Sequence, residues 1–290
     1  MKQILLIFFL FLSFFIEAQI IDFKHINFEK ADSIANSYQG ATLKNLPFLA
    51  YVLTQNLDTQ VEQFRAIHTW VCANIKSDHS FGEVVLKKRN KLKNNKEAFL
   101  NWNNQVQSKM YKKLLIDQKT ICSGYAYLIK ELSALSNIDC EIVNGYIRTT
   151  TRNVGNIDIP NHSWNAINLN NKWYLVDATL ASGYFNLDEE RFVKNYNDGF
   201  FLASPELYLS KYYPLDEKWI LLNNTLSLNQ FVNSPVTYGK TFKHGVVPIT
   251  PKILIIEVSE NEDVVFKYKV LDKSKKTYLS LVISGGLRYK

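Results

Sequence analysis

The chain has 290 residues, of which 47% are hydrophobic and 13% aromatic, a composition that supports a folded core and excludes a disordered polypeptide. Its net charge of +7 comes from basic residues spread along the chain, with one run from Lys87 to Lys93. Because this run is short and isolated, we interpret it as a solvated face or loop, not as a nucleic-acid patch, and we expect no nucleic-acid partner.

The first 18 residues differ from the rest of the chain. Lys2 is followed by a stretch from Ile4 to Ile16 that is apolar apart from one serine. The stretch is about 13 residues long, which is too short to span a bilayer and is typical of a signal-peptide core. We therefore expect residues 1–18 to be a signal peptide that is cleaved after Ala18. The mature chain would then be exported, to the periplasm or the extracellular space, with no stable membrane span.

The chain contains three cysteines. In an exported protein, Cys72 could pair with Cys140 and leave Cys122 free. Cys72 and Cys140 both lie among apolar residues, so we expect them to be buried free thiols. A disulfide between them stays open as the alternative at this point.

Helical spacing of apolar residues predicts helices within residues 30–75, the second of them from Val61 to Ile75. Asp58 or Thr59 can cap this second helix, and Glu62, three residues after Thr59, would complete a capping box. Residues 84–118 are basic and rich in asparagine, and they carry a helical pattern over 97–115. A further helix begins at or just before Cys122 and presents apolar positions up to residue 135.

Strands are expected after that helix. Residues 141–148 form one, and two more flank Asn170-Asn171, which suits the left-handed turn of a tight hairpin. From residue 235 onward the chain has a β pattern, with strands expected at 252–258, 264–271 and 278–283. We interpret 235–290 as a β-rich C-terminal segment, separate from the domain that precedes it.

Cys122 at a helix N-terminus would benefit from unpaired N–H groups and the positive end of the helix dipole, both of which stabilise a thiolate. Its own backbone N–H is a candidate oxyanion donor. Ser123-Gly124 would let the backbone come close to a substrate carbonyl. The alternative is a buried cysteine that merely starts a core helix.

The predicted hairpin brings two further groups together. With Asn170-Asn171 as a two-residue turn, Leu169 faces Lys172, and His162 and Asp177 become diagonal neighbours on one face. The carboxylate could then hold one imidazole nitrogen while the other points to the thiol. Cys122, His162 and Asp177 are therefore predicted as a catalytic triad.

Metal binding is the competing use of such residues. Zinc sites usually contain close ligand pairs such as C-x-x-C or H-x-x-x-H, and the sequence has neither. It has no glycine-rich phosphate loop either. We expect no metal and no organic cofactor.

Three segments resemble the core motifs of the transglutaminase-like superfamily: TICSGYA at 120–126, NHSWNAI at 161–167 and KWYLVDAT at 172–179. The likeness is greatest to the kyphoscoliosis peptidase branch, through RAIHTWV at 65–71, FFLASPE at 200–206 and WILL at 219–222. It covers about 60–232, and it places residues 19–234 in one transglutaminase-like domain.

The resemblance implies a papain-like α+β fold, in which a helix bearing the cysteine packs on an antiparallel sheet bearing His162 and Asp177. It implies Cys122 as nucleophile, His162 as base and Asp177 as the residue that orients it. Gln118 is the candidate second oxyanion donor.

The expected function is acyl transfer on amide bonds of a protein or peptide substrate. Hydrolysis and crosslinking both remain open, with a preference for a peptidase or amidase. The alternative is a protein-interaction module that lacks strong catalysis, for which exposed aromatics such as Tyr212-Tyr213 would be suitable. The oligomeric state is left open.

Overall fold

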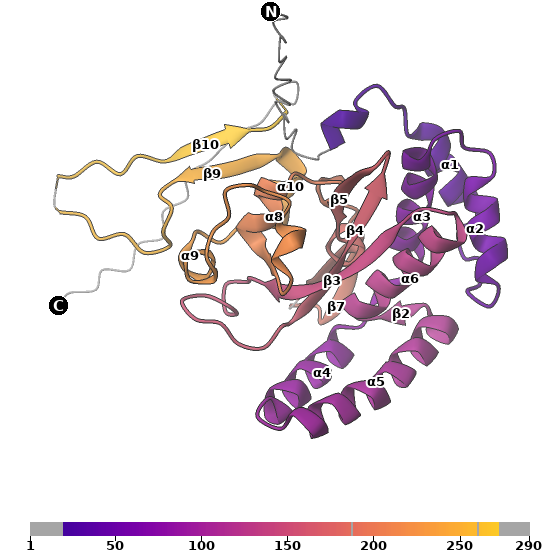
Figure 1. Ribbon diagram of the computed structural model, residues 1–290, viewed down its shortest axis with the longest axis horizontal. Coiled ribbons are helices and arrows are strands. Elements are labelled where there is room, and N and C mark those ends of the chain that lie inside the picture. Colours follow the sequence, from indigo (N-terminus) through magenta and orange to yellow (C-terminus); the bar gives the residue numbers. More distant parts are fainter. Residues whose placement is uncertain (1–19, 187, 260, 273–290) are drawn as a thin grey trace, which may run out of the picture.

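A four-stranded antiparallel sheet lies at the centre of the computed structural model, which describes residues 20–186, 188–259 and 261–272 (Figure 1). The strands are ordered β5-β4-β3-β8. Their bounds are Cys140–Ile147 for β3, His162–Leu169 for β4, Lys172–Val176 for β5 and Tyr212–Pro214 for β8.

Helices cover both faces of this sheet, with α1, α2, α3 and α6 on one side and α8 and α9 on the other (Figure 1). Strand β4 is buried along nearly its whole length, as expected for a central strand covered on both faces. The bounds are Glu29–Ser37 (α1), Leu46–Thr54 (α2), Gln60–Asn74 (α3), Cys122–Leu135 (α6), Pro205–Lys211 (α8) and Leu228–Asn233 (α9).

The predicted start of α3 is confirmed. Thr59 Oγ1 accepts a hydrogen bond from the backbone N–H of Glu62, and the Glu62 carboxylate accepts one from the N–H of Thr59. This capping box satisfies two N–H groups that a helix start would otherwise leave unpaired. The apolar face of α3 is buried against α1, α2 and α6.

Helices α4 (His79–Leu92) and α5 (Lys96–Asp117) form a hairpin beneath the sheet (Figure 1). The short strands β1 (Lys76–Ser77) and β2 (Lys119–Thr120) pair in parallel at its base. β1 leads the chain into α4, and β2 leads it into α6. The basic run lies on α4 and on the residue after it, with Lys87 and Lys88 exposed, so it forms a solvated face as predicted.

The hairpin of β4 and β5 has the predicted register. Leu169 is opposite Lys172, and Asn165 is opposite Val176. Asn170 and Asn171 both have positive φ, at 54° and 62°, which is the conformation that a two-residue turn of this kind demands. The register thus follows from the turn, since the turn fixes which residues face each other.

The remaining elements connect the sheet to its surroundings. They are η1 (Ile20–Phe23), α7 (Ala178–Ser182), β6 (Gly183–Asn186), β7 (Arg191–Lys194), η2 (Asp198–Phe200), η3 (Glu217–Ile220) and α10 (Gly239–His244).

The C-terminal segment differs from the expectation. Its described strands are β9 (Val246–Thr250) and β10 (Lys267–Val270), which pair in a two-stranded antiparallel sheet. The strand expected at 252–258 does not form, the one expected at 264–271 is limited to β10, and 278–283 lies outside the described residues. Phe242 of α10 and Val247 of β9 belong to the main hydrophobic core, so this part of the segment packs on the body of the molecule.

The α+β class is confirmed by the mixture of helices with an antiparallel sheet. Cys72, Cys122 and Cys140 are free thiols, with Cys72 and Cys140 buried as expected. Among the described residues, no helix combines the length and the apolar character needed to cross a bilayer.

Candidate active site

Cys122 is the first residue of α6, and its side chain is partly exposed. The first N–H groups of a helix have no acceptor within the helix. Ile121, which precedes the helix as its N-cap, makes no side-chain capping bond. Polar backbone groups and the positive end of the helix dipole therefore lie next to the thiol, where they favour its ionised form.

Gly124 has a packing role that the sequence did not indicate. A Cβ at this position would lie 1.9 Å from Oγ1 and 2.9 Å from Cβ of Thr120, inside any permitted contact. The glycine therefore allows the first turn of α6 to pack against β2, and it fixes where the helix begins relative to that strand. Its contribution to the site is the position of Cys122.

His162 is the first residue of β4, and it is 9% exposed. Its Nε2 is 2.7 Å from Oδ2 of Asp177. Because this nitrogen is engaged by the carboxylate, Nδ1 is the nitrogen left for the thiol of Cys122. His162 and Asp177, which the hairpin predicts to be diagonal neighbours, are therefore in direct contact.

Asp177 directly follows β5 and caps α7. Its Oδ1 accepts hydrogen bonds from the backbone N–H groups of Thr179 at 2.8 Å and Leu180 at 3.1 Å. Its Oδ2 binds His162 and accepts a second bond, from the hydroxyl of Tyr212 at 2.7 Å. These four bonds leave the carboxylate little rotational freedom, so it holds the imidazole in one orientation.

The three side chains shift one another's pKa values. Burial opposes ionisation of Cys122, but the charge of His162, its hydrogen bond to the thiol and the N–H of Ser163 bring the thiol pKa below its usual value. Burial also opposes protonation of His162, but Asp177 and Cys122 raise the pKa of the imidazole to about 10.

Asp177 completes this set of charges. Burial raises the pKa of Asp177, but the charge of His162, its hydrogen bond to the carboxylate and the hydroxyl of Tyr212 together bring this pKa below the usual range. The site therefore favours the thiolate, the imidazolium and the carboxylate over their neutral forms.

Tyr212 was missed as a site residue. The sequence suggested that Tyr212 and Tyr213 are exposed, and this is wrong, because they are only 1% and 5% exposed. Tyr212 is 35 positions from Asp177 and reaches it because β8 pairs with β3. No local pattern indicates that pairing, since β8 has only three residues.

Gln118 makes a structural bond that the sequence did not indicate. It is the left-handed C-cap of α5, with φ of 48°, and its Nε2 donates to the carbonyl of Ala41 at 2.6 Å. Its amide donor is therefore occupied by a structural bond, and the assignment of Gln118 as second oxyanion donor is not supported.

A second cysteine–histidine pair lies on α3. Cys72 Sγ is 3.7 Å from Nε2 of His68, one helical turn away. Burial raises the pKa of Cys72, and burial together with Arg65 lowers the pKa of His68 to about 3. Both groups are therefore neutral at physiological pH, so this pair is part of the core.

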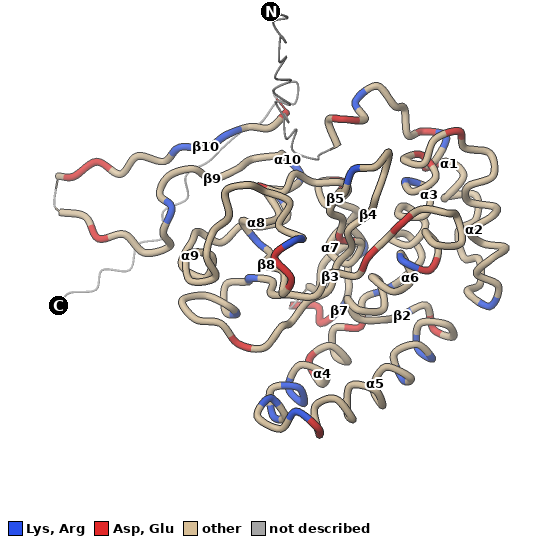
Figure 2. Tube along the Cα trace, in the orientation of Figure 1, with Lys and Arg blue, Asp and Glu red and all other residues tan. Residues whose placement is uncertain are grey.

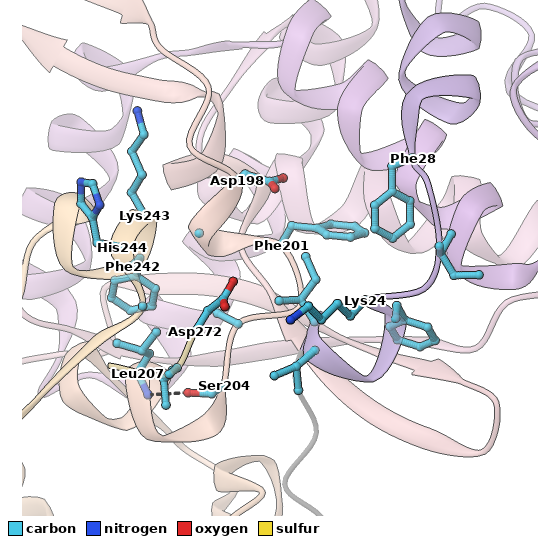
Figure 3. A pocket seen from close by; sticks show the side chains of 18 residues that line it. Lys24, Phe28, Asp198, Phe201, Ser204, Leu207, Phe242, Lys243, His244 and Asp272 are labelled. Carbon is cyan, nitrogen blue, oxygen red and sulfur yellow. Dashed lines mark hydrogen bonds between the residues drawn. The ribbon is translucent and has the colours of Figure 1, made fainter. Parts of the chain in front are cut away.

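Within the described part of the chain, no group of three or more His, Cys, Asp or Glu side chains is arranged to hold a metal ion. The cavity shown in Figure 3 has a volume of about 240 Å³ and lies near α10 and η1, lined largely by apolar side chains such as Phe28, Phe201 and Phe242. None of the three predicted site residues lines it.

Comparison with known proteins gives consistent family matches. Residues 47–178 match the family model described as the transglutaminase-like superfamily. The chain is 30% identical to human kyphoscoliosis peptidase over 234 residues, which are 79% of this chain and 32% of that protein. It is 24% identical to hillarin of Drosophila melanogaster over 236 residues, which are 76% of this chain and 26% of that protein.

A solved structure described as "Crystal structure of a TGase" matches 55% of this chain and 35% of its own, at 14% identity and a TM-score of 0.30. The chain spans about a third of the length of the human relative.

Proposed function

This chain carries a domain of the transglutaminase-like superfamily, and from that premise we propose that it is a thiol enzyme that transfers acyl groups from amide bonds of proteins or peptides. Cys122 is the nucleophile, His162 moves the proton and Asp177 orients the imidazole. The observation that carries the proposal is the 2.7 Å bond between His162 Nε2 and Asp177 Oδ2, beside a thiol whose pKa is lowered by the same imidazole.

The reaction starts from the thiolate–imidazolium pair. The sulfur of Cys122 attacks the carbonyl carbon of the amide, and the π electrons of the carbonyl move to its oxygen. The N–H groups at the start of α6, including that of Cys122, would donate hydrogen bonds to this oxyanion. The imidazolium of His162 gives its proton to the amide nitrogen as the C–N bond breaks, which leaves a thioester on Cys122 and a free amine.

The second half of the reaction depends on the acceptor. Neutral His162 takes a proton from water as the water oxygen attacks the carbonyl carbon of the thioester. The C–S bond then breaks, which releases a carboxylic acid and restores the thiolate of Cys122 beside the imidazolium of His162. An amine attacking in the same way would give a new amide bond, and thus a crosslink. We favour hydrolysis, because the human relative with the stated similarity is named a peptidase.

We also propose that the chain is exported. The support is the apolar stretch within residues 1–18, whose length and flanks suit a signal peptide. A mature N-terminus at Gln19 would agree with this, and an intact N-terminus at Met1 would contradict it.

Alkylation of Cys122 tests the proposed function without knowledge of the substrate. Iodoacetamide at pH 7, with the site of labelling located by mass spectrometry, should modify Cys122 much faster than Cys72 or Cys140. In His162→Ala the thiol loses its proton acceptor and its ion pair, so labelling should slow by about tenfold or more. His25→Ala removes an exposed histidine far from the site along the chain and serves as the matched control.

Asp177→Asn tests the role of the carboxylate. The amide keeps an acceptor for the helix N–H groups, but its NH₂ group would face Nε2 of His162. The imidazole would then carry its proton on the nitrogen that faces the thiol, and labelling should again slow by about tenfold or more. Equal and slow labelling in the wild type, His162→Ala and Asp177→Asn would contradict an activated thiol and favour an interaction module.

Turnover then separates the two reaction types. Release of peptides from casein would indicate hydrolysis, and incorporation of a fluorescent primary amine into casein would indicate crosslinking. Cys122→Ser should abolish whichever is found.

A further inference from the structure

Helix α10 of the C-terminal segment packs closely on η2, the 3₁₀ helix that follows β7. A Cβ on Gly199 of η2 would lie 2.2 Å from the carbonyl carbon of Phe242, so the two backbones are in direct contact. At the first residue of α10, the carbonyl of Gly239 accepts a hydrogen bond from Nδ2 of Asn197 at 2.8 Å. These two contacts fix the position of α10 relative to η2, and with it the position of Phe242.

The ring of Phe242 lies among three other aromatic rings. It is 2% exposed, and it stacks on Phe200 of η2 with the ring centroids 4.4 Å apart. It meets Tyr212 of β8 and Tyr208 of α8 edge to face, with centroid distances of 6.1 and 6.0 Å. Stacked and edge-to-face arrangements are the favourable ones for aromatic pairs. Phe242 thus joins η2 to α8 and β8.

Two of these neighbours hold Asp177. The backbone carbonyl of Phe200 accepts a hydrogen bond from the N–H of Asp177 at 3.2 Å. The hydroxyl of Tyr212 donates to Oδ2 of Asp177 at 2.7 Å, and the same oxygen binds His162. Phe242 therefore contacts both of the residues that fix the backbone and one carboxylate oxygen of Asp177.

The ring of Tyr212 is held on several sides. Within residues 19–234, its aromatic neighbours are His162, Trp164 and Tyr208. Among the described residues, Phe242 is the one aromatic neighbour that comes from the C-terminal segment. A smaller side chain at position 242 would leave space beside the ring and let the hydroxyl move away from Asp177.

We propose that Phe242 is a positioning residue for the triad: it holds the hydroxyl of Tyr212 and the carbonyl of Phe200 against Asp177, so the C-terminal segment completes the active site without contributing a reacting group. This inference rests on the proposed function, since the triad is what Phe242 positions.

A single apolar substitution tests this role more cleanly than removal of the segment. Figure 2 shows acidic and basic residues along β10 and along the loop that joins it to β9, and a truncation would remove their charges together with Phe242. Phe242→Leu changes no charge and keeps an apolar side chain in the core.

The pH profile of Cys122 labelling by iodoacetamide is the readout. In Phe242→Leu a less firmly held Asp177 would orient His162 less well, so the thiol would lose part of the support for its ionised form. We expect the midpoint of the profile to rise by about 0.5 to 1 pH unit, which lowers the labelling rate below the midpoint by about 3- to 10-fold. Phe242→Met should shift the midpoint in the same direction, and it replaces Phe242→Leu if that variant does not fold.

Val247→Ala is the matched control. Val247 of β9 belongs to the same segment and is buried in the same core, but it has no ring that could stack beside Tyr212. This variant should lose stability in urea and keep the wild-type midpoint. A loss of stability in both Phe242→Leu and Val247→Ala, with the midpoint unchanged in both, would mean that Phe242 only fills the core.

Tyr212→Phe tests the route of the effect. It keeps the ring and removes the hydroxyl that binds Asp177, so its midpoint should also rise. If Phe242 acts through this hydroxyl, the combined variant should shift the midpoint by clearly less than the sum of the two single shifts. Additive shifts would overturn the proposal, because Phe242 would then act independently of Tyr212.

The outcomes separate this inference from the proposed function. A wild-type midpoint well below pH 9 that stays the same in Phe242→Leu would overturn the role of Phe242 and leave the proposed function standing. A wild-type midpoint at pH 9 or above would contradict the activated thiol itself, and the role of Phe242 with it.

Discussion

Asp177 shows how single residues assemble the site. Each oxygen of its carboxylate accepts two hydrogen bonds, one pair from the backbone of α7 and the other from His162 and Tyr212. A carboxylate tied at four points is both oriented and kept ionised. Asp177 thus fixes the orientation of His162 and, through His162, favours the ionisation of Cys122. Asp177 itself touches no reacting atom.

The pH dependence of Cys122 labelling is a prediction at this scale. The pKa of Cys122 lies below its ordinary value of 9.0, and that of His162 is raised to about 10. The thiolate should therefore persist as the pH falls below 9, and alkylation should stay rapid at neutral pH. In His162→Ala burial still opposes ionisation of the thiol, so the labelling rate should rise only at or above the ordinary thiol pKa of 9.0.

The same shifts give the sign of the effect on folding. Because the folded-state pKa of His162 is raised, its contribution to stability is full below about pH 6.5 and is lost as the pH rises through about 10. Because the folded-state pKa of Asp177 is lowered, its contribution to stability is present above about pH 4 and is lost in stronger acid.

For the labelling of Cys122, a wild-type pH profile with its midpoint at pH 9 or above would contradict the ion pair of Cys122 and His162.

At the scale of elements, the start of α6 depends on the fit between Gly124 and Thr120. A side chain at Gly124 would overlap both Oγ1 and Cβ of Thr120, and Thr120 is fixed by its strand pairing with Ser77. The helix could then keep its position only if β2 moved. If the helix moved instead, Cys122, which is two residues from Gly124 at the start of α6, would move with the helix.

We expect Gly124→Ala to destabilise the fold by about 1–3 kcal/mol, measured as the free energy of unfolding in urea. Gly82→Ala is the matched control, because Gly82 is also in a helix and a Cβ there would make an ordinary contact at 3.6 Å with Ile121. That variant should be stabilised by about 0.5–1 kcal/mol. Equal effects in both variants would contradict the steric role of Gly124.

The elements also show where local sequence information is sufficient. The capping box of Thr59 and the turn at Asn170-Asn171 depend on residues within four positions of each other, and both were predicted. The strand expected at 252–258 was not found, because among the described residues no second strand pairs with this segment. A β pattern produces a strand only when a partner completes its hydrogen bonds.

At the scale of the whole molecule, Arg65 connects three distant segments. Its guanidinium binds Asp32 of α1 through Nε at 2.7 Å and through Nη2 at 2.9 Å, and its Nη1 binds Asp198 of η2. The side chain of Arg65 is 8% exposed and also lies against the rings of Phe28 and Phe201. It thus joins the N-terminal helices to the segment that follows β7.

Arg65→Met should lower the free energy of unfolding by about 1–3 kcal/mol, because it removes the buried cation that pairs with Asp32 and Asp198, whose own side chains are 32% and 50% exposed. Arg191→Met breaks an exposed ion pair and should cost about 1 kcal/mol or less, and both can be measured by urea denaturation. If the two variants lose similar stability, Arg65 is not the connection that its contacts indicate.

Sequence by itself determined the features that depend on near neighbours: Cys122 at the beginning of a helix, and His162 and Asp177 on a hairpin whose turn sets the register. Only the tertiary structure decided which remote groups complete the site. Tyr212 reaches Asp177, and Gln118 is held by Ala41. The physical reason is that local patterns are set by backbone geometry over a few residues, whereas these contacts depend on how separate elements pack.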